Sequence, residues 1–189
     1  MIYTDKWAFI HIPKTSGTNL KYNCRMQLKN IQEPYRYALN EKRLLQHSPL
    51  HVWEHRVPNR KFIAIVRNPY QRAVSQWLYS LNFDLFLNKF GNVSFKDYWQ
   101  LTFEGFDWNL NTSQNEFIKS NKNNKVKFFK LETELKDLED FIKVKLTSTK
   151  VNSQPTYNYK DYYDDYAKSL ISNLFEEDFK KFNYDIREI

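Results

Sequence analysis

Residues 7–20 decide the fold, and they read Trp7-Ala8-Phe9-Ile10-His11-Ile12-Pro13-Lys14-Thr15-Ser16-Gly17-Thr18-Asn19-Leu20. An apolar run stops at Pro13, and a lysine, small hydroxyl residues and one of only three glycines follow before an apparent helix begins. A strand, a short turn and a helix in this order favour anion binding, because the backbone N–H groups of the turn and the helix dipole both attract negative charge. Lys14 adds a mobile positive charge, and Thr15, Ser16 and Thr18 add hydroxyl donors.

A second stretch, residues 62–79, has the same strand–turn–helix form. It begins as a continuous apolar run, which is typical of a strand buried on both faces, and this run ends at Arg67. Asn68 is a good N-cap and Pro69 a good first helical residue, so we expect a helix from there to residue 81. Arg67 is therefore expected at the C-terminal end of a strand, and Ser75 about two turns into the next helix.

The rest of the chain alternates apolar strands with helical patterns. Strands are expected at 6–12, 61–67 and 125–131, and further helices at 18–30, 94–102, 112–121, 132–144 and 160–182. Helices between apolar strands favour a parallel sheet with crossover helices, and ligands of such sheets bind outside the carboxyl ends of the strands. Residues 31–60 and 82–111 are expected to be largely irregular and carry no motif that identifies a substrate.

The two stretches are neither triphosphate nor dinucleotide motifs, because Lys14 precedes Gly17 and no earlier glycine is present. Pro13-Lys14-Thr15-Ser16-Gly17-Thr18 instead resembles the 5′-phosphosulfate loop of sulfotransferases that use 3′-phosphoadenosine 5′-phosphosulfate (PAPS). Residues 67–75 resemble the 3′-phosphate-binding motif of the same family, R-[ND]-P-[YW]-x-R-x-x-S. Because both motifs occur in the family's order and in the same structural context, each supports the other.

This resemblance implies a P-loop-like three-layer α/β fold, with a small central parallel sheet flanked by helices in a single domain over residues 1–189. It implies transfer of a sulfuryl group from PAPS to a hydroxyl of a carbohydrate-like acceptor, as in the glycan 2-O-sulfotransferase group. A weaker likeness extends to the polar loop near residue 152. The positions that would bind the donor are Lys14, Thr15, Ser16, Gly17, Thr18, Asn19, Arg67, Ser75, Asn152 and Ser153.

In-line sulfuryl transfer needs a cation at the leaving oxygen, hydrogen-bond donors around the phosphosulfate and a base for the acceptor hydroxyl. Lys14 fits the first role, and no metal is expected, because a sulfuryl group carries less charge than a phosphoryl group. Some glycan sulfotransferases, the uronosyl 2-O type among them, place a base histidine shortly before the arginine strand. By that resemblance His47 is the first candidate base and His51 the second, while Pro49 interrupts the helical spacing that a metal site on His47, His51 and His55 would need.

Composition limits the other classes of function. A chain of 189 residues with 41% hydrophobic residues can bury one core, and its single cysteine, Cys24, excludes an intrachain disulfide and a cysteine-based zinc site. No apolar run approaches the ~18 residues of a membrane-spanning helix, and no signal-peptide pattern is present. We therefore expect a soluble cytoplasmic protein of bacterial or viral origin.

Three alternatives stay open at this point. The net charge of +7 suits a nucleic-acid-binding module, although the chain has no RNP, KH or zinc signature and an anionic nucleotide donor explains the same sign. An ATP-using P-loop relative lacks support without the first Walker A glycine. A relative that binds the nucleotide without turnover would show the same motifs. Neither the acceptor nor the oligomeric state can be inferred from the sequence.

Overall fold

The computed structural model describes residues 1–33, 47–105, 111–147 and 157–189. The chain separates into two compact units. The first comprises Met1–Arg67 and Gln114–Asn152, and the second Asn68–Ser113 and Ser153–Ile189. The expectation of one domain over residues 1–189 stays a prediction. Within the described ranges, no helix is long and apolar enough to cross a membrane.

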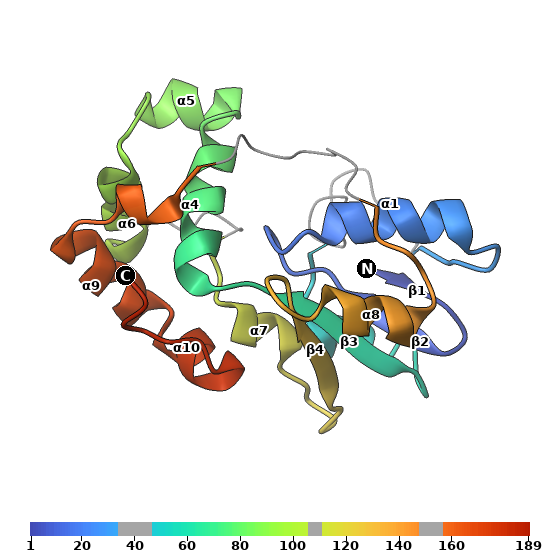
Figure 1. The fold of residues 1–189 in the computed structure, drawn as a ribbon. Coiled ribbons are helices and arrows are strands. Elements are labelled where there is room, and N and C mark those ends of the chain that lie inside the picture. The colour runs from blue at the N-terminus through green and yellow to red at the C-terminus, as the bar shows by residue number, and fades with distance from the viewer. Residues whose placement is uncertain (34–46, 106–110, 148–156) are drawn as a thin grey trace. The chain divides into compact units, whose positions relative to one another are not determined.

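The first unit is built on a four-stranded sheet with the order β1-β2-β3-β4 (Figure 1). Its strands are β1 (Ile2–Tyr3), β2 (Trp7–Ile10), β3 (Lys61–Val66) and β4 (Val126–Lys130). β2, β3 and β4 are parallel, with Trp7 opposite Lys61 and Phe62 opposite Val126, whereas β1 runs antiparallel to β2. The expected parallel sheet is confirmed, with one short antiparallel strand added at its edge.

Helices cover this sheet because β3 is apolar on both faces. Successive side chains of a strand point to opposite faces, and every residue from Phe62 to Val66 is buried. On one face Ile63 and Ile65 belong to a cluster that includes residues of α1 (Gly17–Gln27) and α8 (Leu135–Ile142). The members contributed by these two helices are Leu20, Cys24, Leu138 and Ile142. The α/β class with helices flanking a small central sheet is therefore confirmed.

Two short helices complete the first unit. α3 (Leu50–Trp53) begins directly after Pro49, which confirms that no continuous helix runs from His47 to His55. α7 (Gln114–Ile118) is shorter than the expected helix at 112–121. The turn between α7 and β4 is fixed by the buried carboxylate of Glu54. That carboxylate accepts hydrogen bonds from the Asn121 N–H at 2.9 Å, from Asn124 Nδ2 at 3.0 Å and from the Ser120 hydroxyl.

The second unit is helical, and its helices surround an aromatic core. They are α4 (Pro69–Ser80), α5 (Asp84–Phe90), α6 (Phe95–Phe103), the 3₁₀ helix η1 (Tyr159–Tyr162), α9 (Asp165–Leu174) and α10 (Glu176–Phe182). The N-cap role of Asn68 is confirmed, since its Oδ1 accepts from the N–H of Tyr70 at 2.9 Å and of Gln71 at 3.3 Å. Buried rings that form the core include Tyr70, Phe95, Tyr98, Trp99, Phe175 and Phe179.

Two expectations for the second unit were wrong. The helix expected over 160–182 is interrupted between α9 and α10, because Phe175 leaves the helical region with φ −118° and ψ 25° and packs its ring in the core. The aromatic stretch at 82–111, expected to be irregular apart from one helix, also contains α5. α5 is anchored chiefly by one buried residue, Phe86, which gives little periodicity to detect.

Candidate functional site

The loop between β2 and α1 has a strained and well-supported backbone. Lys14 and Ser16 both have φ of 66°, in the left-handed region that non-glycine residues seldom adopt. Such conformations cost on the order of 1–3 kcal/mol each and persist where the surroundings fix them, often at functional sites. One support is a hydrogen bond from the buried Thr15 Oγ1 to the carbonyl of Ile12 at 2.9 Å. This hydrogen bond stabilises the strained conformation of the loop.

Gly17 allows the start of α1 to lie directly on His11. A Cβ atom at position 17 would stand 2.1 Å from Cδ2 of the His11 ring and 2.3 Å from Nε2, so any larger residue must displace the imidazole. His11 is buried. Burial is the largest cause that lowers the pKa of His11 well below its usual value, and the charges of His47 and Lys21 act in the same direction. The start of α1 at Gly17 therefore packs against a neutral imidazole.

The N-terminus of α1 lacks the usual compensation of its dipole. Ser16 occupies the N-cap position without making a side-chain cap hydrogen bond, and no acidic residue lies in the first turn. Since the first N–H groups of a helix have no partner within the helix, this end favours an anion. Lys14 and Ser16 are half-buried, and Thr18 is exposed. The predicted donor-binding residues of this loop thus surround one helix N-terminus.

Arg67 lies at the end of β3, as predicted, and a buried glutamine holds its backbone. The Arg67 N–H donates to Oε1 of Gln114 at 2.8 Å, and Nε2 of Gln114 donates to the Arg67 carbonyl at 2.7 Å. Nη1 of Arg67 donates to the backbone carbonyl of Lys14 at 3.4 Å, which links the two motifs directly. Its Nε atom is buried and has no hydrogen-bond partner among the described residues.

Of the two candidate bases, His47 is the one that the described contacts join to the loop. Its Nδ1 lies 3.0 Å from the carbonyl of His11, and the two imidazole centroids are 4.3 Å apart. Because a carbonyl can only accept, Nδ1 carries the proton, and Nε2 is then the basic nitrogen of the ring. His51 is exposed on α3. The role of either histidine in catalysis stays a prediction.

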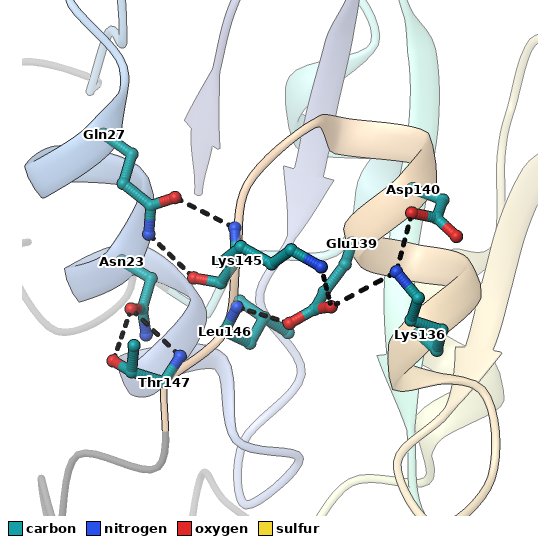
Figure 2. Close-up of polar contacts among 8 residues, drawn as sticks. All are labelled: Asn23, Gln27, Lys136, Glu139, Asp140, Lys145, Leu146 and Thr147. Atoms are coloured by element: carbon teal, nitrogen blue, oxygen red, sulfur yellow. Dashed lines mark hydrogen bonds and ion pairs between the residues drawn. The ribbon is translucent and has the colours of Figure 1, made fainter.

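Asn19 uses its side chain inside the protein. Its Nδ2 donates to the carbonyl of Thr147 at 3.2 Å, and its Oδ1 accepts from Asn23. Farther along α1, Gln27 pairs with both backbone groups of Lys145, at 2.9 Å for the N–H and 2.7 Å for the carbonyl (Figure 2). Between them Asn23 accepts from the N–H of Thr147 at 3.3 Å and from its hydroxyl at 2.8 Å, so three amides, one per turn of α1, hold residues 145–147 against the helix. The predicted role of Asn19 in donor binding stays a prediction, now beside an observed structural role.

The remaining predicted positions are not brought to the loop by the described contacts. Ser75 is buried in α4 of the second unit, so its predicted partnership with Arg67 stays a prediction. Asn152 and Ser153 lie outside the described residues. Across residues 1–33, 47–105, 111–147 and 157–189, no group of three or more His, Cys, Asp or Glu side chains forms a metal site.

Sequence reasoning missed Gln114. Its contact with Arg67 joins residues 47 positions apart, and no local pattern marks a glutamine at a helix start as a backbone partner. Its role is visible only in the fold, where a polar side chain with no exposed surface must find hydrogen-bond partners inside the protein.

These residues form two cationic positions at the ends of neighbouring parallel strands, with Lys14 after β2 and Arg67 after β3. Such an arrangement can bind a ligand with two anionic groups. The chain matches the model of the sulfotransferase family over residues 1–133, a range that includes both motifs and Gln114. Searches of curated proteins and of solved structures found no match. Because the matched range covers more than half of its length, the chain belongs to the sulfotransferase family.

Proposed function

We propose that the protein transfers a sulfuryl group from PAPS to a hydroxyl of a carbohydrate-like acceptor. Membership of the family implies a sulfuryl donor and a hydroxyl-bearing acceptor in general terms. PAPS as the donor, the carbohydrate acceptor and the residues that act on them are the proposed part. The observation that carries the proposal is the buried Nε of Arg67, which has no hydrogen-bond partner among the described residues and lies on the strand next to the Lys14 loop.

The residues present fit a nucleotide with two anionic ends. A buried donor without a partner costs about 1–3 kcal/mol, and a phosphate oxygen would satisfy the Nε of Arg67. A planar guanidinium also suits two phosphate oxygens at once, so Arg67 is assigned to the 3′-phosphate, together with Ser75. The backbone N–H groups of residues 15–19 are assigned to the phosphosulfate, and Asn152 and Ser153 to the nucleotide.

When bound, the donor supplies a sulfuryl group activated by its linkage to phosphate. The ammonium group of Lys14 is placed to offset the negative charge that develops on the bridging oxygen as its bond to sulfur breaks. Nε2 of His47 accepts the proton of the acceptor hydroxyl, while the hydrogen bond from Nδ1 to the His11 carbonyl fixes the orientation of the ring. The N–H groups at the start of α1 hold the phosphosulfate in place during transfer.

The decisive test is a calorimetric titration of the full chain with adenosine 3′,5′-bisphosphate and with adenosine 5′-phosphate. We expect the wild type to prefer the bisphosphate roughly 10- to 100-fold, because charge-assisted hydrogen bonds contribute about 1.5–3 kcal/mol. Arg67→Ala should abolish this preference, and Arg187→Ala, at an exposed arginine of the second unit, should keep it. Equal binding of both nucleotides by the wild type contradicts the assignment.

A transfer assay with labelled PAPS and a panel of glycans then tests turnover. Label on a glycan hydroxyl supports the enzyme, and preference for the bisphosphate without transfer to any acceptor would identify a nucleotide-binding relative. Tighter and strongly salt-dependent binding to oligonucleotides than to the bisphosphate would instead indicate a nucleic-acid-binding module.

A further inference from the structure

Gln114 continues the hydrogen bonding of the sheet beyond the point where the strands end. The last paired residues of β3 and β4 are Val66 and Lys130, and the N–H of Leu131 still donates to the Val66 carbonyl at 2.8 Å. The residue after β3 is Arg67, and its N–H and carbonyl pair with the side-chain amide of Gln114 instead of with a strand. The amide thus replaces one residue of a neighbouring strand and satisfies both backbone groups of Arg67.

Gln114 itself is held on a well-fixed element. It has no exposed surface, and Phe117 and Ile118 of the same helix are buried. The turn that follows α7 is bound by Glu54, which accepts from the Asn121 N–H at 2.9 Å. The amide of Gln114 therefore has little freedom to move, and the backbone position of Arg67 is set from outside its own strand.

This backbone position determines where the guanidinium of Arg67 begins, and the guanidinium also contacts the Lys14 loop through the bond from Nη1 to the Lys14 carbonyl. We infer that Gln114 is a positioning residue that sets the spacing between the two cations, and so selects a nucleotide that carries a 3′-phosphate as well as a 5′-anion. The inference rests on the proposed function. Gln114 does not contact the nucleotide and acts through Arg67.

Removing the amide of Gln114 removes two hydrogen bonds to the backbone of Arg67. Gln114→Met keeps the length of the side chain but leaves the N–H and the carbonyl of Arg67 without partners in a half-buried place, which is unfavourable for each of them. The end of β3 must then shift or admit water, and the guanidinium shifts with it. Gln114→Asn is milder, because its amide stays polar but is one methylene too short to reach both groups.

The first unit contains a matched control. Gln27 pairs with the N–H and carbonyl of Lys145 at 2.9 and 2.7 Å (Figure 2). Gln114 makes the same kind of contact with Arg67. Lys145 has no assigned part in donor binding. Gln27→Met therefore removes the same chemistry in the same unit without touching either cation, although Gln27 is exposed and water can replace it more easily.

The experiment titrates the wild type, Gln114→Met, Gln114→Asn, Gln27→Met and Arg67→Ala with adenosine 3′,5′-bisphosphate and adenosine 5′-phosphate, well below the melting temperature of each variant. We expect the preference for the bisphosphate to fall about tenfold in Gln114→Met, less in Gln114→Asn and not at all in Gln27→Met, with the affinity for the monophosphate nearly constant. The inference alone is overturned if both Gln114 variants keep the wild-type preference. It is also overturned if Gln27→Met loses as much of the preference as Gln114→Met does. A wild type without any preference overturns the proposed function as well.

Discussion

The two cationic ends of the sheet are held in opposite ways. The loop after β2 has a left-handed backbone at Lys14 and Ser16, and residues near it in sequence support it, as in the close packing of Gly17 on His11. At the end of β3 the backbone of Arg67 is instead held by the side chain of a glutamine 47 positions later. Two cationic positions on adjacent parallel strands can thus be built from local backbone conformation or from a distant side chain.

The largest effect on activity is expected from Lys14→Met, which changes the first of the two positions and leaves the second in place. The substitution removes the ammonium group but leaves the backbone carbonyl that accepts from Arg67. We therefore expect kcat for sulfuryl transfer to fall about 10³-fold, as for loss of a charge-stabilising group, while the preference for the 3′-phosphorylated nucleotide stays. Steady-state kinetics and calorimetry measure the two quantities separately.

Lys29→Met, at an exposed lysine just beyond α1, is the matched control and should leave both quantities unchanged. Unchanged turnover in Lys14→Met would remove Lys14 from the mechanism. A parallel loss of nucleotide preference would show that the two positions are not independent.

A smaller effect on kcat is expected from replacing His47, which contacts the His11 carbonyl next to the loop after β2. His47→Gln removes the proposed base, so kcat should fall about 10²-fold, the lower end of what a positioned base contributes, with little change in affinity for the bisphosphate. His51→Gln changes an exposed residue of α3 and serves as the control. Full activity in His47→Gln together with loss of activity in His51→Gln would move the base to His51.

The contrast between the two positions also explains what the sequence could predict. The loop after β2 is visible because every residue type that it needs stands in one run from Pro13 to Thr18. Arg67 is visible because an apolar strand ends there and an N-cap and a proline follow. Both are local signals, in which neighbouring residues report on each other. The parallel sheet follows from the same strands and the helices between them.

The features that were missed depend on distant contacts or on too few residues. Gln114 acquires its role through the fold alone, because nothing near it in sequence marks Arg67 as its partner. β1 has two residues, too few to show any periodicity. The positive φ angles of Lys14 and Ser16 have no sequence signal, since these residue types seldom adopt them. Local patterns thus identified the charged groups, and the structure shows what holds them.

The smallest expected effect is a pH dependence of stability that arises from His11, which packs against Gly17. The pKa of His11 is lowered well below its usual value, so the folded chain resists protonation there while the unfolded chain accepts a proton below about pH 6.5. The contribution of His11 to the free energy of unfolding is therefore complete above that pH and declines as pH falls, by at most ~1.4 kcal/mol per pH unit.

Melting temperatures measured from pH 5 to 8 test this expectation. They should fall less steeply on the acid side in His11→Gln than in the wild type or in the control His55→Gln. An equal acid slope in all three proteins would mean that the imidazole under Gly17 is not the group that titrates.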